Sequence, residues 1–256
     1  MNRIDNLFQT KKEKILSVYF TAGFPSVDSI GEIILSLERN GADMIEIGIP
    51  YSDPLADGPV IQETSKIAIS NGMTLQNLFV QLRHLRSRTE IPLLLMGYIN
   101  PVLQFGFERF CDTAAATGID GLIIPDLPVD EYKKSYKETV TNNNLNNILL
   151  ITPDTSEQRI REIDEICTGF IYMVSSASIT GKTMAFGENH LKYFRRISGM
   201  KLKNPALAGF GIHNRQTKEQ VFSIVQGAII GSAYLRALQE GNSIEGSTRT
   251  FFRAMN

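Results

Sequence analysis

The sequence predicts a (β/α)8 (TIM) barrel formed by a single domain, residues 1–256. Eight short apolar runs alternate with amphipathic helical patterns, and about 250 residues is the usual size of such a barrel. An open doubly wound sheet would show the same alternation, but eight units without a ninth favour the closed barrel. The predicted strands begin near Ile15, Asp43, Ile91, Ile119, Asn147, Gly169, Pro205 and Gly227.

A helical pattern follows each predicted strand, and two connections are longer than the others. The helices are expected at 28–39, 74–88, 103–117, 128–141, 156–166, 188–199, 214–225 and 243–254. The connection after the second run holds an extra helix near 59–71, where Pro59 suits the first turn. Another extra helix is expected near the eighth strand, starting at Ser232, and the connection after the sixth run has surplus residues at 175–187. Long loops at the carboxyl ends of barrel strands commonly carry function.

Composition excludes several classes of partner and compartment. A net charge of −1 gives no reason to expect binding to nucleic acid or to an anionic membrane. No apolar stretch approaches the roughly 20 residues that span a bilayer, and the run after Lys14 is too short for a signal peptide. Cys111 and Cys167, the only cysteines, lie far apart in the sequence, which indicates a reducing compartment. We therefore expect a cytoplasmic protein.

Neither a metal site nor a cofactor site is predicted in this chain. No group of histidines, cysteines and carboxylates has the spacing of metal ligands, so the metal ligands are predicted to be none. No glycine-rich dinucleotide fingerprint follows the first strand.

The second predicted strand and its loop contain two candidate catalytic acids. Ile45 and its alternate neighbours form an apolar face, which puts Glu46 on the other face with Gly48 near the strand's end. Gly48 has no side chain, so an open space for a ligand is expected beside Glu46. The proline-rich loop then supplies Asp57. The residues alone leave two interpretations open, because an ion-paired glutamate and ordinary Asp-Gly turn chemistry would look the same.

The seventh and eighth predicted strands end in glycines that suit a phosphate group. Gly211 follows the seventh strand, and Gly231 and Ser232 follow the eighth, at the start of a helix. Barrels often bind phosphate there, because backbone N–H groups and a helix N-terminus favour an anion. Many enzymes that act on phosphorylated sugars share this arrangement, so it does not define the reaction.

Two segments of the chain resemble signatures of the tryptophan synthase alpha subunit family. They are the string from Glu46 to Gln62, with both acids in place, and the end of the fourth strand, Ile123 to Pro128. The resemblance implies that Glu46 and Asp57 are catalytic and that Tyr19, Met96, Tyr98 and Tyr172 line the pocket for the indole and glycerol groups. It also implies a closing loop in which Thr180 contacts substrate and Gly181 contacts phosphate. Ser176 stands where many members have arginine, and Lys182 could replace that charge.

The implied reaction is a retro-aldol cleavage of indole-3-glycerol phosphate to indole and glyceraldehyde 3-phosphate, in tryptophan biosynthesis. The implied partner is the pyridoxal-phosphate-dependent beta subunit, in an α2β2 complex, so the cofactor is expected in the partner. An apolar rim of Val102, Leu103, Phe105 and Phe107 at the catalytic face is consistent with an interface. The alternatives are another barrel enzyme acting on a phosphorylated sugar, a freestanding lyase that releases indole, and a non-catalytic binding subunit.

Overall fold

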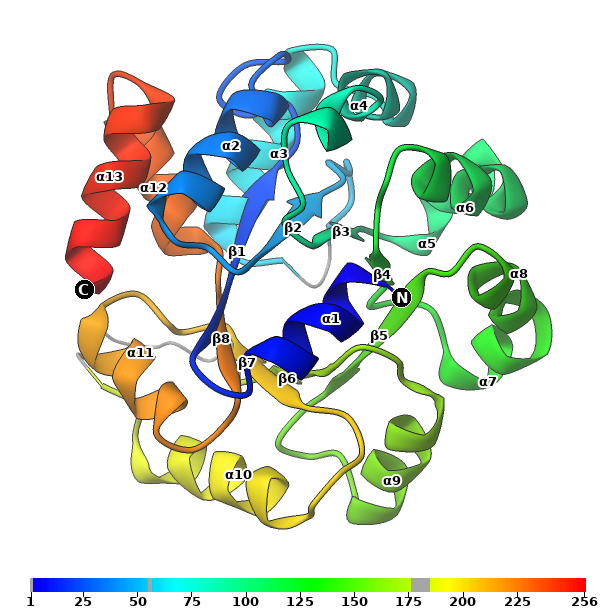
Figure 1. Cartoon of the computed structure of the whole chain (residues 1–256), viewed down its shortest axis with the longest axis vertical. Coiled ribbons are helices and arrows are strands. Elements are labelled where there is room, and N and C mark those ends of the chain that lie inside the picture. Colours follow the sequence, from blue (N-terminus) through cyan, green and yellow to red (C-terminus); the bar gives the residue numbers. More distant parts are fainter. Residues whose placement is uncertain (1, 55–56, 176–184) are drawn as a thin grey trace.

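Eight parallel strands close into a barrel in the order β1 to β8, with β8 paired to β1 (Figure 1). The computed structural model describes residues 2–54, 57–175 and 185–256. The strands are β1 (Ile15–Thr21), β2 (Met44–Gly48), β3 (Leu93–Met96), β4 (Gly121–Ile123), β5 (Asn146–Ile151), β6 (Ile171–Val174), β7 (Ala206–Gly209) and β8 (Gly227–Ile230). The closed barrel confirms the predicted fold and excludes the open sheet.

Helices surround the barrel and cover its outer surface. They are α2 (Ile30–Asn40), α3 (Pro59–Ser70), α4 (Leu75–Leu82), α5 (Ile99–Phe105), α6 (Phe107–Ala116), α7 (Val129–Glu131), α8 (Lys137–Asn142), α9 (Glu157–Ile166), α10 (Glu188–Gly199), α11 (Arg215–Phe222), α12 (Ser232–Glu240) and α13 (Ile244–Met255). The extra helices predicted after β2 and near β8 are therefore confirmed, as α3 and as α12 beside α13. Pro59 occupies the first turn of α3, as expected.

Three predicted helices are interrupted. The pattern at 103–117 divides into α5 and α6, because Gly106 adopts a φ of +91° that a continuous helix does not allow. The pattern at 74–88 divides into α4 and a short 3-10 turn, Leu85–Ser87. In this turn the Arg86 side chain donates a hydrogen bond to the carbonyl oxygen of Ile91 at 2.7 Å. The pattern at 128–141 contains a π-helical segment, Tyr132–Tyr136, between α7 and α8.

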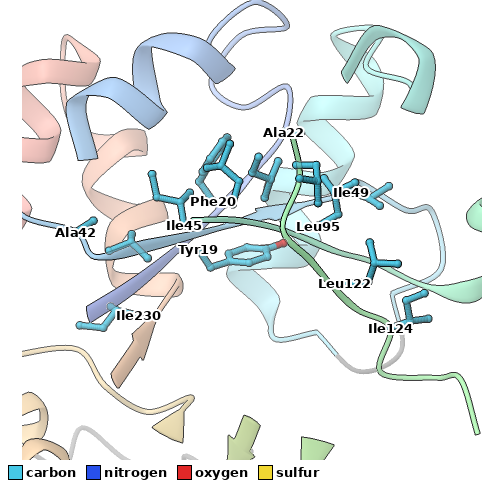
Figure 2. Close-up of a cluster of buried hydrophobic side chains, with 14 of the residues drawn as sticks. Tyr19, Phe20, Ala22, Ala42, Ile45, Ile49, Leu95, Leu122, Ile124 and Ile230 are labelled. Atoms are coloured by element: carbon cyan, nitrogen blue, oxygen red, sulfur yellow. The ribbon is translucent and has the colours of Figure 1, made fainter. Parts of the chain in front are cut away.

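Alternation along the strands separates two apolar layers. Outward side chains such as Phe20 and Ile45 pack under the helices, whereas inward ones such as Met44 and Leu94 fill the barrel. Figure 2 shows this division at β1, where the ring of Tyr19 points away from the neighbouring Phe20. The inward face of each strand therefore determines what can reach the barrel's interior.

A helix that the sequence analysis did not predict, α1 (Arg3–Thr10), lies across one end of the barrel (Figure 1). Its Ile4 side chain is fully buried in the interior layer. Arg3 bonds Asp120, which lies just before β4, at 3.1 Å. Eight residues are too few for a strong periodic signal, and tertiary packing stabilises such a helix. Because α1 covers the end where the strands begin, the opposite end is left for a functional site.

Candidate active site

Glu46 is a buried carboxyl group on the inward face of β2. Its side chain is 0% exposed, and its Oε1 accepts a hydrogen bond from the Ser17 hydroxyl at 2.9 Å. Its Oε2 has no hydrogen-bond partner among the residues that the structure describes. Burial raises the pKa of Glu46 to about 8, although the bond from Ser17 lowers it. Much of Glu46 is therefore protonated at neutral pH and can donate a proton.

Asp57 lies in the loop after β2, directly before the N-cap of α3. Gln62 holds this turn, because its side-chain amide donates to the Asp57 carbonyl oxygen at 2.9 Å. Burial raises the pKa of the Asp57 carboxyl to about 6, and a hydrogen bond from Tyr98 opposes that rise. Most of Asp57 is therefore ionised at pH 7, while Glu46 still binds its proton.

Tyr19 on β1 and Tyr172 on β6 both lie close enough to the two acids to be affected by their charges. Their hydroxyl groups are buried, which raises both pKa values above the usual range, and the charges of Glu46 and Asp57 raise them further. Tyr19 is paired in register with Glu46. Tyr98, which follows β3, stacks on Tyr51 with ring centroids 5.2 Å apart. Met96 ends β3 and is half-buried.

Gly48 does not leave the open space that was the reason to expect a ligand beside Glu46. A β-carbon at Gly48 would overlap the Tyr19 hydroxyl, so the Tyr19 ring itself covers this glycine. Gly209 is covered in the same way by Tyr172. The expectation considered β2 alone and missed the long side chain that reaches over from β1. Both glycines are thus required for the placement of tyrosines.

The glycine-rich ends of β7 and β8 lie side by side, since these strands pair in the barrel. Phe210 and Gly211 both have positive φ, +68° and +73°, so the chain turns sharply after β7. Ser175, the residue after β6, holds this turn, because its hydroxyl donates to the Phe210 carbonyl oxygen at 2.6 Å. Gly231 is the N-cap of α12, and Ser232 is its first residue. The predicted anion cradle therefore has a helix N-terminus on one side and a left-handed turn on the other.

Thr180 and Gly181, which the sequence analysis assigned to the closing loop, lie outside the described residues. So do Ser176 and Lys182.

Comparison with known proteins identifies the family. The family model described as "Tryptophan synthase alpha chain" matches residues 6–254. The chain is 55% identical over 240 residues to the tryptophan synthase alpha chain of Flavobacterium psychrophilum, covering 94% of each chain. It is 53% identical to that of Christiangramia forsetii, covering 96% of each. The chain belongs to the tryptophan synthase alpha chain family.

Solved structures of tryptophan synthase have the same fold. The alpha subunit from Legionella pneumophila superposes with a TM-score of 0.89 at 31% identity, over 100% of this chain and 97% of that one. Tryptophan synthase from M. tuberculosis, in its aminoacrylate-bound form, gives 0.86 at 27% identity, over 100% and 98%. As a member of the family, the chain is a carbon–carbon lyase of tryptophan biosynthesis. It cleaves indole-3-glycerol phosphate to indole and glyceraldehyde 3-phosphate.

For this alpha chain, sequence reasoning missed the direct partner of Glu46. The sequence analysis assigned no role to Ser17. The signal that could have identified this partner is a small polar residue at an inward position of an otherwise apolar strand. Within the described residues, no group of histidine, cysteine and acidic side chains could hold a metal ion, and no helix is long and apolar enough to cross a membrane.

Proposed function

We propose that Glu46 and Asp57 divide the chemistry of the retro-aldol cleavage between them. The observation that carries this proposal is the buried Glu46 carboxyl, whose Oε2 lacks a partner in the described structure and whose pKa is about 8. Asp57, with a pKa of about 6, supplies the negative charge nearby. Two carboxyl groups held in different protonation states are a general solution for acid–base work.

The cleavage proceeds in two proton transfers. Glu46 first donates its proton to C3 of the indole ring, which leaves a positive charge on the ring nitrogen. Asp57 accepts a hydrogen bond from that N–H and stabilises the cation. The Glu46 carboxylate then removes the proton of the hydroxyl group next to the ring. As this oxygen becomes a carbonyl, the bond from its carbon to C3 breaks, and its electron pair returns to the ring. Indole and glyceraldehyde 3-phosphate leave, and Glu46 is protonated again.

The chain is proposed to form a single domain, residues 1–256. The remaining proposed contacts position the substrate within it. Tyr19, Met96, Tyr98 and Tyr172 contact the indole and glycerol groups, and Thr180 contacts the substrate from the loop after β6. The phosphate is bound by Gly181, Gly211, Gly231 and Ser232. Support comes from the inward orientation of the buried tyrosines and from the position of Ser232 at the first turn of a nine-residue helix.

Adding a negative charge at Ser232 tests the phosphate site. Ser232→Asp should weaken glycerol phosphate binding about 100-fold or more by charge repulsion, with indole binding largely unchanged. The fold should remain intact, because an acidic residue at a helix N-terminus is favourable. Calorimetric titration with each ligand measures both effects.

Ser243→Asp is the matched control, since Ser243 is exposed and caps the start of α13, beyond the far end of α12. It should leave both affinities unchanged. If Ser232→Asp also left phosphate affinity unchanged, the phosphate would bind elsewhere.

The proposed partner is the tryptophan synthase beta subunit, which carries the pyridoxal phosphate, in an α2β2 complex in the cytoplasm. The apolar rim expected for this interface is smaller than predicted, because Val102 and Phe107 are buried and Phe105 packs against Phe79. Leu103 remains 46% exposed. Beside it lies a groove of about 330 Å³, lined by Ile49, Pro50, Thr74, Leu75, Gln76, Leu78, Pro101, Gln104 and Phe105. The groove adjoins the loop that carries Asp57, so a docked partner would hold Asp57 in its working position.

An indole-release assay tests the activity and the partner together. The isolated chain should release indole from indole-3-glycerol phosphate slowly, and adding beta subunit should raise the rate by orders of magnitude. The reason is that a docked partner holds Asp57 in its working position and so completes the site. Absence of a complex in size-exclusion chromatography, with an isolated chain already fully active, would favour the freestanding lyase.

A further inference from the structure

Ser17 is a second polar side chain that faces the barrel interior, within hydrogen-bonding distance of Glu46. It lies on β1, two residues before Tyr19, and is 0% exposed. Its hydroxyl donates to Oε1 of Glu46 at 2.9 Å, and both groups are completely buried. The interior beside them is apolar, including Met44, Leu94 and Ile229. A hydrogen bond in such surroundings is stronger than one in water, so it restricts how the carboxyl group can rotate.

The bond makes the two carboxyl oxygens of Glu46 chemically different. In a neutral carboxylic acid the carbonyl oxygen is the better acceptor, so the oxygen that accepts from Ser17 is the carbonyl. The acid proton must then be on Oε2. Oε2 is also the oxygen that has no partner among the residues described here. The oxygen that carries the proton is thus the one left free for a substrate.

We propose that Ser17 is a positioning residue for the cleavage: it fixes the rotamer of the Glu46 carboxyl and selects Oε2 as the oxygen that exchanges protons with the substrate. This inference rests on the proposed role of Glu46. Ser17 itself does not contact the reacting atoms. Its hydroxyl remains a donor when Glu46 is ionised, so the same bond stabilises the carboxylate that removes the second proton.

The pH dependence of the reaction can report on this bond, because few groups face Glu46. Among the described residues they are Tyr19 on β1 and Tyr172 on β6, while β3 and β8 present apolar side chains. The charge of Asp57, in the loop after β2, acts on the same two tyrosines. Both tyrosines stay neutral, since burial raises their pKa values above the usual range. Activity should therefore fall below pH 6 as Asp57 gains a proton and above pH 8 as Glu46 loses one. The alkaline limb belongs to Glu46.

Ser17→Ala is the test, with kcat, KM and the pH profile measured on the complex with beta subunit. Loss of the bond should lower kcat about tenfold with little change in KM, because the carboxyl can then rotate. The alkaline limb should move up by roughly one pH unit, since a donor to the carboxylate is lost. Ser17→Thr keeps the hydroxyl, so its alkaline limb should lie at the wild-type pH. Infrared difference spectra should show the carbonyl stretch of neutral Glu46 at higher frequency in Ser17→Ala, with Glu46→Gln identifying the band.

Thr248→Val is the matched control. Thr248 is also fully buried, and its hydroxyl pairs with that of Tyr234 at 2.9 Å, between α13 and α12. This variant should lose stability with both pH limbs unchanged. A Ser17→Ala enzyme with reduced kcat but an unmoved limb and an unmoved carbonyl band would overturn the inference and leave Ser17 as a packing residue. An active Glu46→Gln enzyme would instead overturn the proposed role of Glu46.

Discussion

Replacing Glu46 by glutamine should abolish indole release while the substrate still binds. Glutamine keeps the shape and can still accept the hydrogen bond from Ser17, which lies 2.9 Å from Oε1. It cannot exchange protons, so turnover should fall roughly 10²–10⁴-fold, the usual contribution of a general acid–base group. Single-turnover indole release and calorimetric binding of glycerol phosphate, both with the beta subunit present, separate chemistry from affinity.

The stability of the same variant provides an internal control. Burial makes the pKa of Glu46 higher in the folded state, about 8, than the ordinary value near 4.5. The wild-type chain therefore loses stability as pH rises from the unfolded pKa to the folded pKa. Glu46→Gln lacks this loss, so its melting temperature should exceed that of the wild type at pH 8 and approach it at pH 4. A variant that melts lower at pH 8, or that keeps its turnover but loses affinity, would contradict the assignment.

Replacing Asp57 by asparagine should be the second most damaging change. A neutral amide can still hydrogen-bond an N–H but stabilises a developing cation poorly, so turnover should fall on the order of 10²-fold. The pKa of the Asp57 carboxyl is about 6, so the fall in activity below pH 6 should disappear when this residue is asparagine. The measurement is kcat between pH 5 and pH 9 (about the range where these two groups titrate).

Asp53→Asn in the isolated chain is the control for the Asp57 experiment. Asp53 is on the same proline-rich loop but is exposed. Its variant should keep the wild-type rate and both pH limbs, because a solvated carboxylate contributes little to charge inside the site. Near-normal activity in Asp57→Asn would mean that this loop controls access to the site and takes no part in the chemistry.

The candidate site could be predicted from sequence wherever chemistry depends on a local pattern. Glu46 in an apolar strand, the proline-held Asp57 and the glycines after β7 and β8 are each visible within a few residues of the chain. The alternation of side chains also places Tyr19 and Glu46 on inward faces. A buried carboxyl with a raised pKa follows from that placement alone.

Contacts between distant segments could not be predicted in the same way. Helix α1 was missed, because its fit depends on Ile4 entering the barrel and on Arg3 meeting Asp120 far along the chain. The expected effect of Gly48 was wrong for the same reason, since the position beside this glycine is covered by the Tyr19 side chain from a different strand.

The sequence by itself determined the barrel, the two acids and the helix start at Ser232, because strand alternation, proline and glycine act over a few residues. Only the tertiary structure decided which groups meet around Glu46. Closing the barrel brings Ser17 of β1 to 2.9 Å from Oε1 and turns the ring of Tyr19 over Gly48. These contacts depend on strand register and on side-chain length across the barrel, and neither can be predicted from the order of residues along one strand.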